Sequence, residues 1–437
     1  MAFFEVIKMF QNKEEFLTFL GSQKKFSMKL SLERIERACE LLDHPETKLK
    51  TIHVAGTNGK GSTCNYMVNL LQASGYKVGM YISPYIITFN ERIQINGNYI
   101  SDEDLIAAAN KVLPIVEQVE AELQDDMTEF EVITLIAFVY FYEQKVDYAV
   151  FEVGLGGRFD ATNVILPIVG GITNISFDHM GVLGDTIGQI AYEKVGIAKK
   201  RMKLFTTEVK EEALKVFKQV CHEKGAYLNM IDHDLVTHIK PLDEGISFLY
   251  EPYDLEITLP MLGQHQVQNA LLALKMYETI LEHEEEFFDK DLVKDAFSKA
   301  KWAGRLEIVS KDPLVIIDGS HNEDGVKQLV LAMQYYLNKG YQINTVFAAL
   351  KDKDTENMLS QLQSISKVLY LTSFDFYRAS TAERLYSQSN GVNVLFHEDY
   401  QHVIKECLNN RNSKEILLIT GSLYFISEVK KFLNNNK

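Results

Sequence analysis

Residues 51–63, which read TIHVAGTNGKGST, carry the strongest local signal for the fold. The first five residues are mostly β-branched or apolar, which is typical of a buried strand, and Gly56, Gly59 and Gly61 follow. Glycines let backbone N–H groups curve around phosphate oxygens, and a helix that begins directly after them adds positive potential. The spacing is GxxGKGS and not the common GxxxxGK[ST], but the strand, the lysine and the hydroxyl are present. We therefore predict a phosphate-binding loop in which Lys60 reaches the β/γ-phosphates of a nucleotide.

Strand and helix patterns alternate on both sides of this loop, which indicates an α/β fold with mainly parallel sheets. We predict strands at 50–55, 78–82, 148–153 and 169–173, and helices at 60–73, 129–143, 186–199, 266–282 and 290–300. The pattern breaks at KWAGR, residues 301–305, and then resumes at 314–317, 322–337, 345–349, 367–371 and 416–419. We expect an N-terminal phosphate-loop ATPase domain over 1–299, a linker over 300–304 and a smaller Rossmann-like domain over 305–437.

The charge of the chain excludes several kinds of partner. Its 437 residues carry 45 Lys+Arg against 60 Asp+Glu, a net charge of −15. Binding to nucleic acid or to anionic lipid requires a basic face, so we expect neither. The most apolar stretch, residues 135–142, is shorter than the ~20 residues of a membrane span. Residues 1–10 have no basic segment and no cleavage site, so we expect no signal peptide.

The four cysteines are scattered and form no CxxC pair. This is typical of reduced thiols in a cytoplasmic protein and indicates neither a zinc site nor a disulfide framework.

Acidic and imidazole side chains follow two predicted strands. Glu152 stands near the end of one strand, and Asp178 and His179 follow the next. Open α/β sheets bind ligands at the carboxyl ends of their strands, so Glu152 is a candidate Mg²⁺ ligand and His179 a candidate metal ligand or proton acceptor. The alternatives are a salt-bridge partner for Glu152 and an ordinary loop histidine for His179.

Lys194 lies on a predicted helix between apolar residues. It is either a surface lysine paired with a glutamate or a partly buried amine with a lowered pKa. In the second half, Arg305 is suited to bridging phosphate oxygens, and Asp318 and His321 are suited to ribose or phosphate edges.

A phosphate loop, Mg²⁺ ligands and a second α/β domain together favour an ATP-dependent ligase. The first domain would phosphorylate a carboxylate, and the second would bring the amine that attacks the acyl phosphate. Domain closure would exclude water from this intermediate. A simple kinase or NTPase would leave the second domain without a use.

Eight motifs in order resemble the folylpolyglutamate synthase family, including its bifunctional dihydrofolate synthase form, within the Mur ligase superfamily. They are GTNGKGS (56–62), Ser83-Pro84 with FNERI (89–93), EVGLGGRFDATN (152–163), Asp178-His179, EKVGI (193–197), HQVQNA (265–270), WAGR (302–305) and DGSHN (318–322). Peptidoglycan ligases of the superfamily carry an additional N-terminal domain, for which we expect no room before Gly56.

The resemblance implies a role for each matching residue. The ATP site would consist of Asn58, Gly59, Lys60, Gly61, Ser62, Asn269, Arg305, Asp318 and His321, and the metal site of Ser83, Glu152 and His179. Thr128, Phe130, Phe159 and Asp160 would lie near the pterin of the folate. Lys194 matches a lysine that CO₂ converts to a carbamate, whose negative charge would help to hold a second Mg²⁺. Lys194, His179 and Lys60 would be the catalytic residues.

The resemblance also implies the reaction. Mg-ATP would drive addition of L-glutamate to the γ-carboxylate of a folate, through an acyl phosphate, with release of ADP and phosphate. The alternatives are a bifunctional enzyme that also accepts dihydropteroate, a Mur-type amino-acid ligase, and a nucleotide-gated binding NTPase. Only small-molecule partners are expected, and the protein is expected to be a cytoplasmic monomer.

Overall fold

The computed structural model describes residues 9–24, 30–409, 412 and 414–435. Most of residues 1–10, on which the signal-peptide prediction rests, therefore lies outside the described residues. The chain forms two compact units. The first unit comprises Met1–Ile175, Gly181–Ile231 and Leu272–Phe288, and the second comprises Ser176–Met180, Asp232–Leu271 and Asp289–Lys437. Residues 232–271 thus group with the C-terminal part of the chain, whereas the functional domain boundary at 300–304 stays a prediction.

The first unit contains an eight-stranded sheet in the order β4-β3-β2-β5-β1-β6-β7-β8. The strands from β2 to β8 in this order run parallel, and only β3 and β4 at one edge are antiparallel. The bounds are β1 (Thr51–Ala55), β2 (Val78–Tyr81), β3 (Ile93–Ile95), β4 (Asn98–Tyr99), β5 (Tyr148–Glu152), β6 (Val169–Ile172), β7 (Lys203–Thr206) and β8 (Tyr227–Met230). The prediction of a mainly parallel sheet is confirmed.

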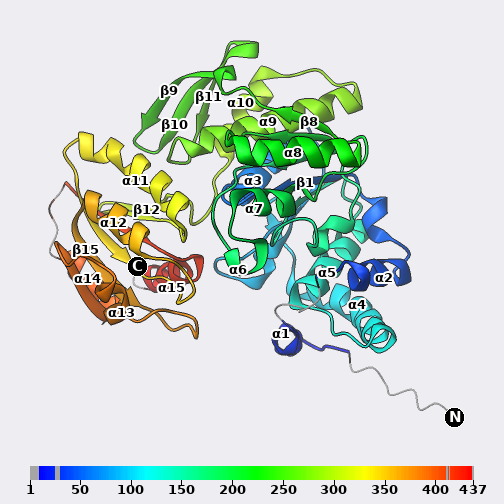
Figure 1. The fold of residues 1–437 in the computed structure, drawn as a ribbon, viewed down its shortest axis with the longest axis horizontal. Helices are drawn as coiled ribbons and strands as arrows, with labels where there is room; N and C mark the ends of the chain where they lie inside the picture. The colour runs from blue at the N-terminus through cyan, green and yellow to red at the C-terminus, as the bar shows by residue number, and fades with distance from the viewer. Residues whose placement is uncertain (1–8, 25–29, 410–411, 413, 436–437) are drawn as a thin grey trace. The chain divides into compact units, whose positions relative to one another are not determined.

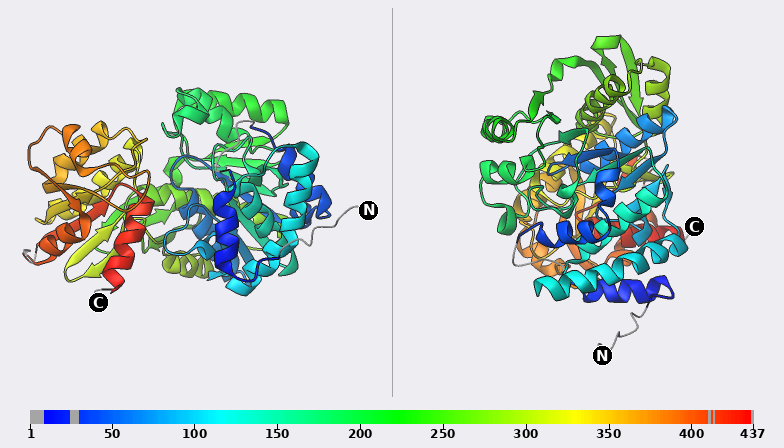
Figure 2. Two further views of the ribbon diagram at one scale, coloured as in Figure 1. Left: turned by 90° about the horizontal axis from the view of Figure 1, so that it is seen from below. Right: turned by 90° about the vertical axis from the view of Figure 1, so that its right-hand side faces the viewer.

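Across the residues that the structure describes, nine α-helices lie wholly or partly in the first unit. They are α1 (Lys13–Ser22), α2 (Glu33–Leu41), α3 (Lys60–Ala73), α4 (Asp102–Leu123), α5 (Glu129–Glu143), α6 (Met180–Leu183), α7 (Ile187–Val195), α8 (Glu211–Lys224) and α9 (His265–Glu284). Helices α6 and α9 begin with residues of the second unit, Met180 and His265. Helix α1 packs along α4, and both contact α5 (Figure 2). Helix α5 is apolar on nearly all sides because it is enclosed by the core. Helix α7 is shorter than the predicted 186–199 because Gly196 ends it.

The second unit contains two sheets. A six-stranded sheet has the order β12-β13-β17-β14-β15-β16 and is parallel except at β12. Its strands are β12 (Glu307–Lys311), β13 (Leu314–Ile317), β14 (Gln342–Phe347), β15 (Ser366–Ser373), β16 (Val394–Asp399) and β17 (Glu415–Thr420). An antiparallel sheet of β9 (Val236–Leu242), β10 (Gly245–Tyr250) and β11 (Leu255–Leu259) was not predicted from the sequence (Figure 1).

The remaining helices belong to the second unit. They are α10 (Lys290–Lys299), α11 (Glu323–Asn338), α12 (Glu356–Ile365), α13 (Ala382–Ser387), α14 (Tyr400–Asn409) and α15 (Leu423–Asn435). Helices α11 and α12 pack on each other, and α14 contacts β14, β15 and β16. Within the described part of the chain, no helix is both long enough and apolar enough to cross a membrane.

Candidate active site

The predicted phosphate loop lies between β1 and α3 and is held by the end of the neighbouring strand β6. The backbone N–H of Thr57 donates to the Asn174 carbonyl at 2.8 Å, and that of Asn58 donates to Asn174 Oδ1 at 2.9 Å. The Thr173 hydroxyl donates to the Asn58 carbonyl at 2.6 Å. Gly59, with φ of 86°, then turns the chain into α3, whose first residue is Lys60. The shape of the loop is thus set mainly through its backbone.

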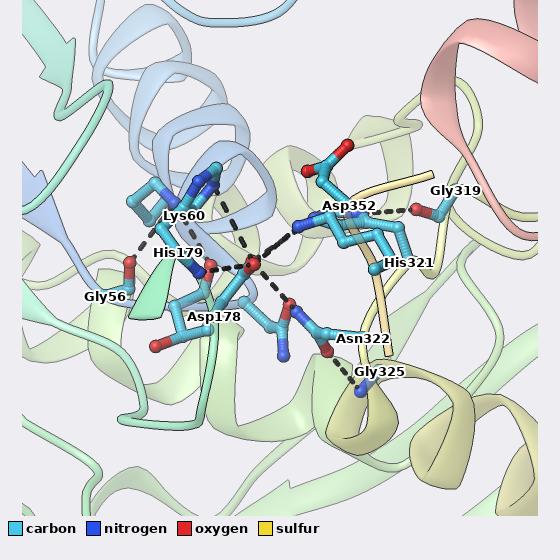
Figure 3. Close-up of polar contacts among 12 residues, drawn as sticks. Gly56, Lys60, Asp178, His179, Gly319, His321, Asn322, Gly325 and Asp352 are labelled. Carbon is cyan, nitrogen blue, oxygen red and sulfur yellow. Dashed lines mark hydrogen bonds and ion pairs between the residues drawn. The ribbon is translucent and has the colours of Figure 1, made fainter. Parts of the chain in front are cut away.

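Two lysines converge on the first glycine of this loop. Lys60 Nζ donates to the carbonyls of Gly56 at 3.2 Å and Thr57 at 3.1 Å (Figure 3). Lys194 Nζ, from α7, donates to the same Gly56 carbonyl at 2.9 Å. Lys194 is only 5% exposed, so it is not the surface lysine of the alternative interpretation. A buried amine needs such a hydrogen bond to offset its desolvation.

Glu152 and Ser83 lie beside each other at the carboxyl ends of two neighbouring strands, β5 and β2. Glu152 ends β5 beside β1, and its Oε2 accepts a hydrogen bond from the Ser83 backbone N–H at 3.2 Å. Glu152 is buried. Among the described residues, no group of three or more His, Cys, Asp or Glu side chains is arranged to hold a metal. Mg²⁺, however, usually takes one or two protein oxygens together with water and substrate phosphates, and this pair fits that requirement.

The loop at 154–163 is organised by Asp160. Its Oδ2 accepts the N–H groups of Gly154 at 3.0 Å and Leu155 at 2.9 Å, and its Oδ1 accepts the N–H and the hydroxyl of Thr162. Burial raises the pKa of Asp160, although these hydrogen bonds lower it. The carboxylate predicted to lie near the pterin is therefore occupied in shaping the loop.

The same loop is joined to helix α7. The Arg158 N–H donates to the Glu193 carbonyl at 2.8 Å, and Asn163 Nδ2 donates to the Gly196 carbonyl at 3.3 Å. A Cβ on Gly157 would lie 2.8 Å from the Lys194 carbonyl, so only glycine allows this approach. The EVGLGGRFDATN and EKVGI motifs thus form one packed structure that carries Lys194.

His53, in the middle of β1, contacts this loop from the sheet. Its Nε2 lies 2.8 Å from the Thr162 hydroxyl, and both residues are 0% exposed. Burial, together with the charge of Lys199, lowers the pKa of His53 to about 3. The imidazole is therefore neutral in the folded protein at physiological pH.

We expect His53 to make the protein less stable in mild acid. Below pH 6.5 the unfolded chain protonates this histidine, whereas the folded chain does not until the pH approaches 3. The free energy of unfolding therefore falls as the pH decreases through this window, by about 2 kcal/mol at pH 5 from this group. Urea unfolding at pH 7 and pH 5 should show a pH dependence smaller by that amount in His53→Gln. His402→Gln is the control, because His402 is exposed and its loss should leave the pH dependence unchanged. If His53→Gln also left the pH dependence unchanged, the prediction would be contradicted.

Thr128 and Phe130 lie at the start of α5. Thr128 caps this helix, because its hydroxyl oxygen accepts the Glu131 backbone N–H at 3.2 Å; the hydroxyl also donates to Glu131 Oε2 at 2.8 Å. Arg34, which is 3% exposed, donates to both Glu131 oxygens at 3.1 and 3.2 Å and also pairs with Asp125. The Phe130 ring lies so close to Gly154 that a Cβ there would be 2.6 Å from Cζ. The buried ion pair thus holds the helix end that presents Phe130.

Arg34→Met is expected to lower the free energy of unfolding by about 3 kcal/mol, because it leaves the buried Glu131 carboxylate without its cation. Arg37→Met is the matched control, since Arg37 lies on the same helix but pairs with Glu122 and Glu40 at the surface. Urea unfolding should show a large shift only for Arg34→Met. Equal shifts for both variants would show that burial of the pair has no importance.

In the second unit, Asp178 is the centre of a polar cluster (Figure 3). Its carboxylate lies 2.6 Å from Lys353 Nζ, 3.4 Å from His321 Nε2 and 3.3 Å from Asn322 Nδ2. Burial alone would raise the pKa of Asp178, but His321 and then Lys353 hold it well below its usual range. His179 Nε2 is 3.9 Å from Asp178 Oδ1. The sequence analysis did not identify Lys353, and its only signal was the charged run KDKD after β14.

The WAGR and DGSHN motifs are joined through Asp318, which follows β13. Its two oxygens accept the N–H groups of Leu306 and Ser320, each at 2.9 Å. The Gly319 N–H donates to the Gly304 carbonyl at 2.9 Å. Burial lowers the pKa of His265. The Asp318 carboxylate acts to raise this pKa, and the Arg305 guanidinium acts to lower it further. The second unit thus brings Arg305 and Asp318 to one place with the start of α9, where Asn269 Nδ2 donates to Gln266 Oε1 at 3.1 Å.

Comparison with known proteins agrees with this arrangement. Residues 54–277 match the Mur ligase middle domain, and residues 304–423 match the Mur ligase glutamate ligase domain. Over 431 residues the chain is 41% identical to a dihydrofolate synthase/folylpolyglutamate synthase of Bacillus subtilis, covering 97% of this chain and 100% of that protein. The chain belongs to the dihydrofolate synthase/folylpolyglutamate synthase family of Mur ligases.

Solved structures of family members share the fold. The folylpolyglutamate synthase of Thermotoga maritima aligns with a TM-score of 0.81 at 35% identity, covering 97% of each chain. That of Mycobacterium tuberculosis, solved with ADP and AMPPCP, aligns with a TM-score of 0.85 at 28% identity, covering 96% of this chain and 97% of that one. The α/β fold class and the family resemblance predicted from the sequence are confirmed.

Proposed function

We propose that this protein is an ATP-dependent ligase that adds L-glutamate to the γ-carboxylate of a folate, releasing ADP and phosphate. The observation that carries the proposal is the hydrogen bond from the buried Lys194 to Gly56, because it joins the EKVGI motif to the phosphate loop. Glu152 and Ser83 lie beside each other at this sheet edge, where they would supply oxygen ligands for Mg²⁺. The names of the family members, and the nucleotides in their solved structures, support the same reaction.

The backbone N–H groups of Asn58 to Ser62 would bind the ATP phosphates, with Lys60 moving from the Gly56 carbonyl to the β/γ-phosphates. Transfer of the γ-phosphoryl group to the folate carboxylate forms an acyl phosphate and ADP. The glutamate amine then attacks the acyl carbon, phosphate leaves, and an amide remains. Orientation of the reactants supplies most of the catalysis in such transfers.

Glu152, Ser83 and His179 would hold Mg²⁺, which screens the phosphate charge when bound. A carbamate on Lys194 would add negative charge for a second ion and would still keep one N–H for Gly56. In the second unit, Asn269, Arg305, Asp318 and His321 would contact the nucleotide.

Thr128 and Asp160 would act on the folate indirectly, because their polar atoms are occupied in the cap of α5 and in the loop 154–163. Phe130, at the capped end of α5, and Phe159, in the loop 154–163, would contact the pterin. An aromatic contact of this kind favours a flat heteroaromatic ring.

A second activity is favoured by the name of the Bacillus subtilis relative, which is both a dihydrofolate synthase and a folylpolyglutamate synthase. Dihydropteroate carries the same pterin and a carboxylate, so the same chemistry would join it to glutamate.

The test is release of ADP and phosphate with Mg-ATP, L-glutamate and either tetrahydrofolate or dihydropteroate, with products identified by mass spectrometry. We expect release only when an acceptor and glutamate are both present. Release without an acceptor would support a binding NTPase, AMP as product would exclude the acyl-phosphate route, and activity only with a uridine-linked muramyl acceptor would indicate a Mur-type ligase.

A further inference from the structure

A buried hydrogen-bond chain links the strand of the phosphate loop to the loop at 154–163. It begins at His53, three positions before Gly56 on the same chain segment. His53 Nε2 lies 2.8 Å from Thr162 Oγ1, and Thr162 Oγ1 lies 2.5 Å from Asp160 Oδ1. The other oxygen of Asp160 accepts two backbone N–H groups of the loop, those of Gly154 and Leu155. The side chains of His53, Thr162 and Asp160 are all buried.

The hydrogen positions in this chain follow from its chemistry. A carboxylate only accepts hydrogen bonds, and a threonine hydroxyl has one hydrogen to donate. The Thr162 hydroxyl therefore donates to Asp160 and accepts from His53, which assigns the hydrogen of the imidazole to Nε2. His53 Nδ1 has no hydrogen-bond partner among the described residues. The imidazole thus donates a single hydrogen bond, from Nε2 to the Thr162 hydroxyl of the loop.

The loop reached by this chain has little freedom. Lys199 Nζ donates to the Asn163 carbonyl at 2.5 Å, and Arg158 and Asn163 bond the end of α7. The loop is thus held by α7 on one side and by His53 on the other. Phe159, which stacks against the Arg158 guanidinium with 4.5 Å between its ring centroid and Cζ, lies within the held segment.

We propose that His53 is a positioning residue for the folate acceptor, acting through Thr162 and Asp160 on the loop 154–163. This rests on the proposed function, in which Phe159 contacts the pterin. Because one strand carries both His53 and the phosphate loop, the acceptor carboxylate and the γ-phosphate would be set by the same rigid element. A displacement of about 1 Å between reacting groups is enough to lower the rate strongly.

The test compares variants that break the chain with variants that keep it, in the full-length protein with Mg-ATP and L-glutamate. His53→Leu removes the donor and Thr162→Val removes the bridging hydroxyl, whereas His53→Gln and Thr162→Ser keep them. We expect the first two to raise KM for tetrahydrofolate about ten-fold, with KM for ATP unchanged. We expect His53→Gln and Thr162→Ser to have KM values close to those of the original protein.

Thr345→Val is the matched control, because Thr345 is also 0% exposed and its hydroxyl bonds Ser366 at 2.6 Å in the second unit. It should leave KM for tetrahydrofolate unchanged. If His53→Leu does not fold, His53→Asn replaces it, since its shorter side chain cannot reach Thr162. The positioning role of His53 would be overturned if the folded His53→Leu and Thr162→Val variants had an unchanged KM for tetrahydrofolate, or if KM rose equally for tetrahydrofolate and ATP. The proposed function would be unaffected by either result. A complete absence of folate product from the unaltered protein would overturn the proposed function and this inference together.

Discussion

Lys194→Ala is expected to lower kcat at least about 100-fold while leaving the fold intact. Lys194 is buried on α7 and donates to the Gly56 carbonyl, so its side chain ends at the phosphate loop. In the proposed function a carbamate at this position adds the negative charge that holds the second Mg²⁺. Truncation to alanine removes both that charge and the contact to the loop. Steady-state ADP release measures the loss of activity, and far-UV circular dichroism measures whether the fold is retained.

A small carboxylate such as acetate should restore part of the lost activity, because it fits the space left by the lysine and returns a negative charge. Lys200→Ala is the control, since Lys200 is exposed in the segment that follows α7. Full activity of Lys194→Ala would show that the amine has no catalytic importance. Loss without rescue, and with circular dichroism altered, would indicate a packing role in place of a chemical one.

Gly56→Ala is expected to abolish measurable ATP binding and to lower the free energy of unfolding by about 2 kcal/mol. A Cβ at Gly56 would lie 1.8 Å from the Thr173 hydroxyl and 3.1 Å from the Thr173 backbone nitrogen. The φ of 141° is also one that residues with a side chain rarely adopt. The loop would have to move away from the end of β6, which would break the hydrogen bonds that it donates to Asn174 and accepts from Thr173.

Calorimetric titration with ADP and Mg²⁺ measures the loss of binding. Gly75→Ala separates steric conflict from backbone strain, because Gly75 has φ of 91° but a Cβ added to it would meet nothing within 4 Å. We expect Gly75→Ala to lose some stability and to bind ADP normally. Normal ADP binding by Gly56→Ala would mean that the phosphates bind elsewhere.

Local sequence patterns were sufficient for the strand, loop and helix around Gly56, and for most of the parallel strands. Buried parallel strands carry continuous apolar runs, and the glycine-rich turn is specified by residues close together in the chain. The antiparallel sheet β9–β11 was not predicted. In β11 the side chains alternate between buried and exposed over only five residues, which is a weak signal in one sequence.

Candidate residues could be chosen from the sequence, but the partners of their side chains could not. The prediction that Asp160 and Thr128 lie near the pterin stays a prediction, and the fold adds that their polar atoms shape a loop and cap a helix. Lys353 had no motif, and its contact with Asp178 joins residues 175 positions apart. Such pairings depend on how strands and loops meet in space, which spacing along the chain does not encode.

Sequence patterns alone were enough for the α/β class and for the strand, glycine-rich loop and helix around Gly56, because glycine spacing and apolar periodicity act over a few residues. The family followed from the resemblance of eight motifs that occur in order along the chain. The burial of Lys194 against Gly56 and the hydrogen bond between His53 and Thr162 become visible only in the folded chain. Both contacts join segments more than 100 positions apart, and each exists because burial makes an unpaired polar group costly.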